Sequence, residues 1–285
     1  MSWTAESAFN SFYSEINLPG THHEIANTRR EYIVGRLRNS GMSVLDSFSM
    51  GSIPRWTALK EHADLDVMVV LHDTNHFKDK SPATVLSNLK RGLGEGAGAT
   101  RQNGQAVTMK FRTWPHADVV PAARYVDDKG KVTHFLIPDT NRGVWLRTNP
   151  PKHSTDMGTA AGQRGANFRQ VITMLKDWNR RQSTMLQSYH IEVIALRMAP
   201  YGWDDRPWSI KKWFDAASPF VDSCWHEGQD ISGYLDYSQC LEIKTQISGA
   251  ARIATTAWGA VSRGDNRTAF SHWQSIFGLK FPSYG

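Results

Sequence analysis

The chain has 285 residues, 40% of them hydrophobic and only two of them cysteines, so it can bury a sizeable core but cannot build a disulfide framework. Its 33 Lys and Arg exceed its 27 Asp and Glu, and this formal charge of +6 favours anionic ligands without demanding them. No apolar run approaches the roughly 18 residues of a membrane span and the start, MSWTAESAFN, does not resemble a signal peptide, so we expect a cytoplasmic protein with no membrane partner.

The predicted elements begin with two helices and a strand. Apolar residues at helical spacing predict an amphipathic helix over residues 8–16. Thr21-His-His-Glu24 has the sequence of a capping box and predicts a second helix, which residues 39–41 end. Residues 44–50 then predict the first strand, which delivers the chain to the pair Gly51-Ser52.

The middle of the chain predicts further strands and one helix. Val67 to Leu71 is a continuous apolar run, as expected of a strand that is buried on both faces. Ser81-Pro82 predicts the start of a helix, because proline is tolerated in the first helical turn. Three more strands are predicted over residues 106–112, 117–126 and 131–137.

The second half of the chain, from Thr155 onward, is mostly helical by pattern. We therefore predict an α+β fold with two lobes. A lobe with a mixed β-sheet, which includes the N-terminal helices, covers residues 1–154. A helical lobe over residues 155–285 closes over it.

Two features that invite a functional interpretation receive a structural one. The glycine-rich stretch 90–104 lacks the Lys-Ser/Thr end and the strand-to-helix context of a phosphate loop, so we expect a flexible surface connection there. Several histidines lie in different segments at no metal-ligand spacing, and we interpret them as structural. These are His22, His23, His62, His116 and His153.

Three aspartates form the most informative pattern in the chain. Asp64 and Asp66 are separated by one residue, so on an extended backbone their side chains project to the same face and can hold a divalent metal together. Asp118 lies in a second predicted strand that could pair beside the first. Three carboxylates at one sheet edge, with the turn Gly51-Ser52 nearby, suit metal-assisted phosphoryl transfer, in which the turn holds a triphosphate.

This pattern resembles that of the polymerase-beta-like nucleotidyltransferases. The residues that carry the resemblance are Gly51-Ser52, Thr57, Asp64-x-Asp66 and Asp118. The resemblance implies the two-lobed nucleotidyltransferase fold and two ions, Mg²⁺ or Mn²⁺, held by the three aspartates. It also implies that a ribose hydroxyl attacks the α-phosphate of an NTP and expels pyrophosphate.

A second cluster, in the helical half, resembles the template-independent nucleotidyltransferases, which include oligoadenylate synthase. Lys176 lies on an apolar predicted helix, and Gln187-Ser188-Tyr189 follows it. The resemblance implies that Lys176 and Ser188 contact the triphosphate and that Tyr189 stacks on a base. An ammonium group and a hydroxyl at a helix start are both suitable partners for phosphate oxygens.

The layout as a whole looks most like the bacterial cGAS-like synthases, also called CD-NTases, of anti-phage defence systems. This resemblance implies that NTPs are joined into a cyclic di- or oligonucleotide second messenger, which acts on a downstream effector. Trp56 stands where many relatives carry Gly, so we expect a differently shaped loop over the phosphates. The chain lacks the Cys/His zinc insertion of the animal DNA sensor, which argues against activation by double-stranded DNA through that device.

Other interpretations of the same residues stay open at this point. One is a nucleotidyltransferase that acts on RNA ends or on a small acceptor, because the aspartate pattern would be the same. Another is a non-enzymatic module that binds nucleic acid, although three anionic groups would not help such a module. The terminal Gly285 raises the hypothesis of a partner that conjugates the C-terminus, as in some of these defence systems. The sequence does not specify the bases, the 2′ or 3′ linkage, or the ring size.

Overall fold

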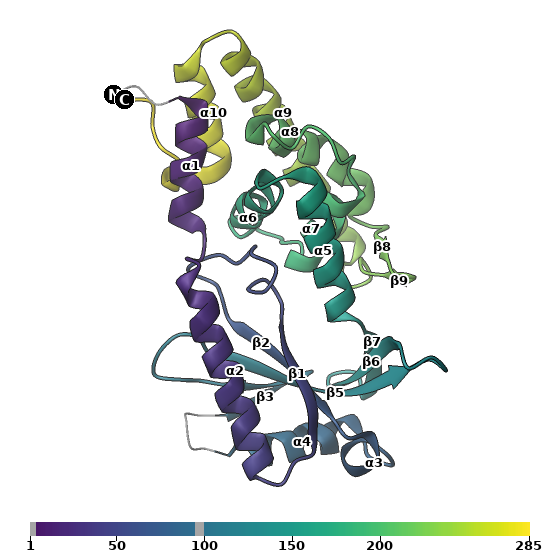
Figure 1. Ribbon diagram of the computed structural model, residues 1–285. Helices are drawn as coiled ribbons and strands as arrows, with labels where there is room; N and C mark the ends of the chain where they lie inside the picture. Colours follow the sequence, from purple (N-terminus) through teal and green to yellow (C-terminus); the bar gives the residue numbers. More distant parts are fainter. Residues whose placement is uncertain (1–3, 95–99) are drawn as a thin grey trace. The chain divides into compact units, whose positions relative to one another are not determined.

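The computed structural model describes residues 4–94 and 100–285, which group by their contacts into two units (Figure 1). The helical unit comprises Met1–Asn17, Thr57–Glu61 and Asp156–Gly285, and the sheet unit comprises Leu18–Trp56 and His62–Thr155. The division next to Thr155 lies one residue from the expected boundary. The first helix and the short segment Thr57–Glu61, which the sequence pattern places in the sheet lobe, group with the helical unit.

The sheet unit contains one mixed sheet. Its strands are β1 (Val44–Met50), β2 (Leu65–Leu71), β3 (Thr100–Asn103), β4 (Ala106–Met109), β5 (Ala117–Val126), β6 (Val132–Asp139) and β7 (Val144–Thr148). Their order is β1-β2-β5-β4-β3, with β6 paired to the second half of β5 and β7 to β6. Strands β2 and β5 are parallel, and the other pairs are antiparallel.

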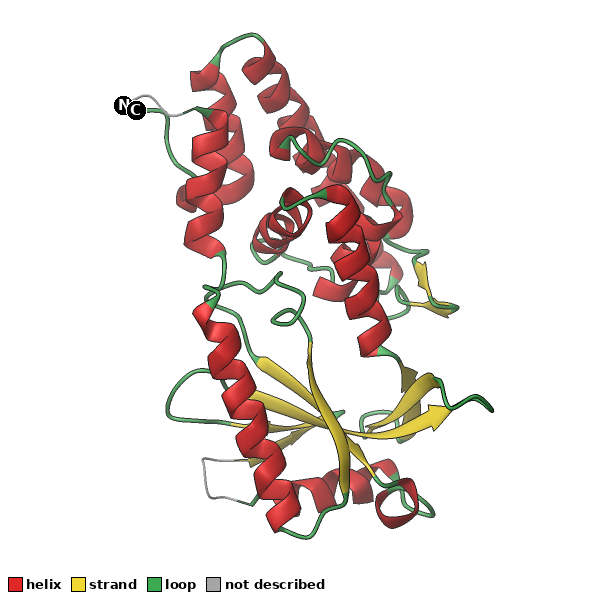
Figure 2. Ribbon diagram, viewed as in Figure 1, coloured by secondary structure: helices red, strands yellow, loops and turns green. Residues whose placement is uncertain are grey.

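Three helices accompany this sheet (Figure 2). They are α2 (Thr21–Asn39), α3 (Asp73–His76) and α4 (Pro82–Leu93), and both α2 and α4 pack on the sheet and on each other. Ser81 caps α4 as predicted, because its hydroxyl accepts a hydrogen bond from the Thr84 N–H. The capping box predicted at Thr21 is wrong. Gly20 precedes α2 in a helical conformation and no side chain caps the helix, so Thr21 is already inside it.

The strands follow the predicted pattern closely where the apolar runs are long. Strand β2 is apolar and buried throughout except at Asp66, and β1 and β5 have the predicted bounds. The prediction of a surface connection over 90–104 is wrong at both ends, because α4 extends to Leu93 and residues 100–103 form β3. Its middle, residues 95–99, lies outside the described part of the chain. Strand β7 was not predicted.

The helical unit contains mainly α-helices, as predicted. They are α1 (Ala5–Ile16), α5 (Pro150–Arg164), which begins in the sheet unit, α6 (Asn167–Asn179), α7 (Ser188–Arg197), α8 (Arg206–Ala217), α9 (Tyr237–Ser262) and α10 (Asn266–Phe277), with short 3-10 turns η1 (Ser218–Phe220) and η2 (Gly278–Lys280). A small hairpin, β8 (Trp225–His226) and β9 (Gln229–Asp230), was not predicted. Among the described residues, no helix combines the length and the apolar character needed to cross a membrane.

Aromatic packing explains why α1 belongs to the helical unit. Phe9 and Phe12 on α1 are fully buried. The Phe9 ring meets the Trp273 ring of α10 edge to face, with the centroids 5.2 Å apart, and Phe12 lies 4.8 Å from Phe277. Burying large aromatic rings is among the strongest contributions that a side chain makes to a core. These contacts hold α1 against α10.

Replacing Phe9 by Ala should lower the free energy of unfolding by about 3–5 kcal/mol, because it leaves a cavity between α1 and α10. Denaturant unfolding monitored by tryptophan fluorescence measures this. Ile25→Ala is the control, since Ile25 on α2 is 45% exposed and its replacement should cost less than about 1 kcal/mol. Similar losses in the two variants would contradict the assignment of α1 to the helical core.

Candidate active site

The parallel pairing of β2 with β5 brings two of the three predicted aspartates together. Asp66 and Asp118 are register partners in this pair, so their side chains project from adjacent positions on one face of the sheet. Both are half-buried. Asp64 lies just before β2 and is exposed. Farther along the same face, Met68 and Val120 belong to an apolar core cluster, so the carboxylates stand at the end of a packed apolar row.

The carboxyl group of Asp66 is affected by its burial and by the charges around it. Burial, together with the negative charges of Asp118 and Asp64, raises the pKa of Asp66 from 3.8 to about 7, although the positive charge of Arg55 opposes this. Thr108 on β4 donates a hydrogen bond to Asp118 and fixes one of its oxygens. Carboxylate and hydroxyl oxygens are the ligands that Mg²⁺ and Mn²⁺ prefer. The donor set therefore fits a divalent cation of this hard class.

Gly51 lies directly against the carboxyl group of Asp66. Its φ is +76°, and a Cβ placed there would lie 1.9 Å from Oδ2 of Asp66. Only glycine fits, because any side chain would clash with the carboxyl group and strain the backbone. Ser52 follows in the turn that runs to Trp56. The predicted Gly-Ser turn thus directly adjoins the aspartate site.

Trp56 ends this turn in a backbone conformation that favours glycine. Its φ is +59°, and its ring stacks on His23 with the centroids 3.6 Å apart. We expected a changed loop because a tryptophan stands where relatives carry glycine. The structure shows that Trp56 adopts the left-handed conformation and that stacking on His23 accompanies it, which offsets part of the backbone strain.

Lys176 on α6 lies in a buried network within the helical unit. Its ammonium donates hydrogen bonds to Glu192 Oε1 at 2.6 Å, to Thr57 Oγ1 at 2.8 Å and to the Thr57 carbonyl at 3.3 Å. The Thr57 hydroxyl in turn donates to Glu192 Oε1 at 2.8 Å. All three side chains are at most 3% exposed. Three hydrogen bonds match the three N–H groups of an ammonium. Lys176 therefore anchors the segment that follows the Gly-Ser turn.

Ser188 and Tyr189 form the first turn of α7. Ser188 is exposed at the helix start, where backbone N–H groups and the helix dipole favour anions. A neighbouring chain of hydrogen bonds fixes this turn. The Gln187 N–H donates to the Tyr234 hydroxyl at 2.8 Å, and this hydroxyl lies 3.0 Å from Nδ1 of buried His190. Tyr189 is half-buried, and its hydroxyl lies 3.2 Å from Nδ1 of His226.

The predicted site residues thus divide between the two units. The sheet unit holds Gly51, Ser52, Asp64, Asp66 and Asp118, and the helical unit holds Lys176, Ser188 and Tyr189. Sequence reasoning missed the partners of these residues. It gave Thr57 no role beyond its place in a motif, and it gave no role to Glu192 or Thr108. A charged residue within an apolar helical run, as at Glu192, is the signal that could have pointed to a buried ion pair.

Comparisons with known proteins identify the family and the fold. Residues 1–160 match the family described as "Second Messenger Oligonucleotide or Dinucleotide Synthetase domain". A "Probable cyclic nucleotide synthase" of Bacillus cereus (strain VD146) is 24% identical over an alignment of 330 residues, and the alignment covers 99% of this chain and 98% of the relative. CdnC of E. coli MS115-1, solved with ATP, has a TM-score of 0.80 at 17% identity, with 97% of this chain and 98% of that chain covered.

Two further structures have the same fold. CdnC was also solved in a complex with HORMA-deltaN, with a TM-score of 0.78 at 17% identity and the same coverage of 97% and 98%. The cyclic AMP-GMP synthase DncV of Vibrio cholerae, solved with the linear intermediate 5′ pppA(3′,5′)pG, has a TM-score of 0.73 at 13% identity over 100% of this chain and 98% of that chain. The predicted two-lobed α+β fold is therefore confirmed.

The raised pKa of Asp66 predicts a pH-dependent stability in the absence of metal. The folded carboxyl binds its proton more tightly than the unfolded one, so this stabilisation is complete below pH 3.8 and is lost as the pH rises through about 7. With a chelator present, Asp66→Asn should therefore melt at a higher temperature than the unchanged chain at pH 8. The difference should shrink at pH 5.5. Parallel melting curves at the two pH values would contradict the raised pKa.

Replacing Lys176 by Met should lower the free energy of unfolding by about 3–5 kcal/mol, because it leaves the carboxylate of Glu192 buried without its ammonium. Adding Glu192→Gln should restore part of this loss. The control is Lys244→Met, which removes an exposed ion pair with Asp222 and should cost at most about 1 kcal/mol. Equal denaturation midpoints for the Lys176 and Lys244 variants would show that losing the ammonium does not leave the Glu192 carboxylate buried and uncompensated.

Proposed function

Because this chain belongs to the Second Messenger Oligonucleotide or Dinucleotide Synthetase family, we propose that Asp64, Asp66 and Asp118 form the centre at which it joins NTPs into a cyclic nucleotide. The chain is a nucleotidyltransferase of the CD-NTase group, a synthase of cyclic nucleotide second messengers. The observation that carries the proposed centre is the register pair Asp66 and Asp118, which Gly51 borders. Family membership favours this function over an RNA-modifying enzyme or a binding module.

The reaction follows from the chemistry of the three carboxylates. They would hold two divalent ions, Mg²⁺ or Mn²⁺, which neutralise phosphate charge and lower the pKa of the attacking hydroxyl. A ribose hydroxyl of one nucleotide forms a bond to the α-phosphorus of another. The bond from that phosphorus to the β-phosphate bridging oxygen breaks, pyrophosphate leaves, and the hydroxyl proton passes to solvent. A second such step on the linear product closes the ring.

Other residues of the chain would hold the donor nucleotide. The backbone of Gly51-Ser52 and the hydroxyl of Ser188 at the start of α7 offer hydrogen-bond donors to a triphosphate. Tyr189 offers an aromatic face to a base. A triphosphate contact by Lys176 would require its ammonium to exchange a hydrogen bond with Thr57 or Glu192 for a phosphate oxygen. The hydrogen bonds from Lys176 to Thr57 also fix the backbone of the segment between Ser52 and Asp64, and both of these residues belong to the proposed site.

The proposed partners follow from this activity. NTPs are the substrates, and a downstream effector would bind the cyclic product. The similar protein CdnC was solved with HORMA-deltaN, which supports a search for a regulatory protein that binds this chain. Conjugation at Gly285 stays a prediction.

The test of the proposal is an incubation of the purified full chain with four NTPs and Mg²⁺ or Mn²⁺, followed by phosphatase treatment and mass spectrometry. A cyclic product should survive the phosphatase, and pyrophosphate should be released with it. The double variant Asp64→Asn/Asp66→Asn should lose activity at least about 100-fold, because the amide groups keep the shape but not the charge that holds the ions. Circular dichroism checks that this variant remains folded.

Two results would contradict this proposal in different ways. Full activity in the double variant would exclude the aspartate centre. Products that all fall to phosphatase, or turnover that requires an added RNA or small acceptor, would exclude a cyclic messenger and leave the nucleotidyltransferase centre in place.

A further inference from the structure

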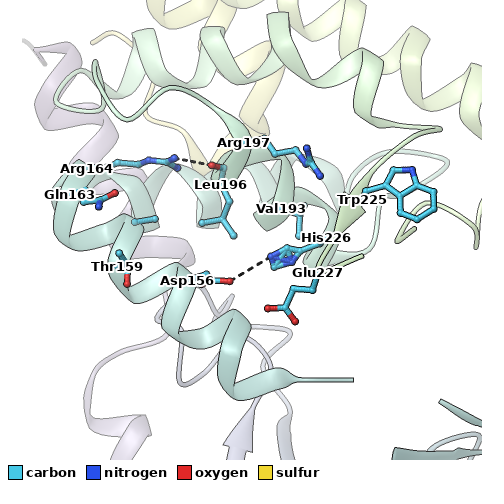
Figure 3. A pocket seen from close by; sticks show the side chains of 11 residues that line it. Asp156, Thr159, Gln163, Arg164, Val193, Leu196, Arg197, Trp225, His226 and Glu227 are labelled. Carbon is cyan, nitrogen blue, oxygen red and sulfur yellow. Dashed lines mark hydrogen bonds and ion pairs between the residues drawn. The ribbon is translucent and has the colours of Figure 1, made fainter. Parts of the chain in front are cut away.

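A pocket of about 380 Å³ lies within the helical unit between α5, α7 and the β8–β9 hairpin (Figure 3). None of the three aspartates of the proposed catalytic centre lines it. One part of its wall carries Asp156 from α5 together with His226 and Glu227 from the hairpin. These three side chains offer an imidazole and two carboxylates, which is a different chemistry from the all-oxygen donor set of the aspartate centre.

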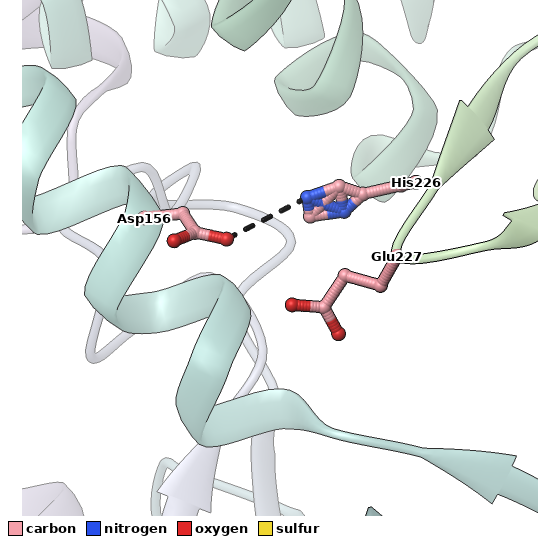
Figure 4. A group of neighbouring side chains, drawn as sticks. All are labelled: Asp156, His226 and Glu227. Carbon is pink, nitrogen blue, oxygen red and sulfur yellow. Dashed lines mark ion pairs between the residues drawn. The ribbon is translucent and has the colours of Figure 1, made fainter.

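The three side chains converge on one point (Figure 4). One ligand atom from each lies within 4.8 Å of the others, and Nε2 of His226 lies 3.8 Å from Oδ2 of Asp156. Ligands in a tetrahedral zinc site, at 2.0–2.2 Å from the metal, are about 3.3–3.6 Å apart. The ligand atoms of the three groups therefore lie at most about 1.5 Å farther apart than coordination requires.

The backbone of the hairpin explains how two consecutive residues reach the same point. Neighbouring side chains on an extended strand project to opposite faces. Glu227 and Gly228 have φ values of +51° and +74°, so they form a tight two-residue turn of the type that favours Asn, Asp or Gly at its first position. The left-handed conformation at Glu227 turns its carboxylate toward the side of His226 that faces α5 (Figure 4).

The orientation of the His226 ring also suits a ligand. Its Nδ1 lies 3.2 Å from the Tyr189 hydroxyl, which leaves Nε2 directed at Asp156. A metal-binding histidine commonly has its second ring nitrogen hydrogen-bonded to a neighbouring group, which fixes the tautomer and the ring plane. Tyr189 on α7 supplies such a group here.

We propose that Asp156, His226 and Glu227 bind one divalent transition-metal ion of the zinc class, with a further coordination position open to the pocket. Imidazole with carboxylates suits Zn²⁺ and similar ions, whereas Mg²⁺ and Ca²⁺ prefer oxygen ligands alone. The ion would connect α5 to the hairpin directly and to α7 through Tyr189. It would therefore stabilise the hairpin and fix the Tyr189 ring.

The experiment uses the full chain carrying Asp64→Asn and Asp66→Asn, so that metal at the aspartate centre is not counted. After treatment with a chelator and its removal, ZnCl₂ is added in a calorimeter. We expect one Zn²⁺ per chain, and an affinity at least tenfold lower after either His226→Asn or Glu227→Gln. Tyr189→Phe should lower the affinity by about tenfold, as loss of a group that orients a ligand does. Zn²⁺ should raise the melting temperature of the parent chain and Mg²⁺ should not.

Two matched variants keep the result specific. His272→Asn removes a histidine elsewhere in the helical unit, and Cys224→Ser removes the buried thiol two residues before His226; both should bind Zn²⁺ like the parent. The absence of binding to the parent would overturn the proposal. So would parental affinity in the folded Glu227→Gln and His226→Asn chains, which would leave the contact between His226 and Asp156 as an ion pair only. Loss of binding in Cys224→Ser alone would also overturn it, because it would place the ion on the thiol.

Discussion

The in-register parallel pairing of β2 with β5 is the constraint on which the candidate active site depends. It holds Asp66 beside Asp118 at fixed positions, although two adjacent carboxylates repel each other and burial disfavours their charged forms. The apolar residues that follow them along both strands are buried on the sheet, and this packing holds the carboxylates together. The repulsion has a chemical consequence, since a bound cation is the most effective way to relieve it.

The segment between the Gly-Ser turn and Asp64 is constrained from both of its ends. Gly51 lies against the Asp66 carboxylate, and Thr57 is held by the buried pair of Lys176 and Glu192. A buried ion pair contributes little net stability compared with apolar packing, but its directed hydrogen bonds specify one position of the backbone. The pair is therefore better understood as fixing the path of this segment than as a source of stability.

Much of the fold and the aspartate site could be predicted because the relevant patterns are local. The residues of β2 are apolar on both faces, and this continuous apolar run alone indicates a buried strand. Asp64 and Asp66 are two residues apart, and this spacing alone indicates that their side chains project to the same face. The capping box at Thr21 failed because Gly20 already has a helical conformation, so Thr21 is the first residue of α2 and not the residue that caps it. Strand β3 has only four residues and no buried ones, so nothing in its composition indicated a strand.

Groups that form through distant residues could not be predicted in the same way. Thr57 and Glu192 meet only because the helical unit gathers the segment Thr57–Glu61, and no spacing in the chain encodes that contact. The same holds for Asp156 and His226, which come from a helix and from a hairpin so short that no strand pattern indicates it. A metal-binding histidine can be recognised from sequence only when the other ligands lie at a characteristic spacing near it in the chain. The role of His226 follows from the left-handed turn at Glu227 and the Tyr189 hydroxyl, and both are properties of the folded chain.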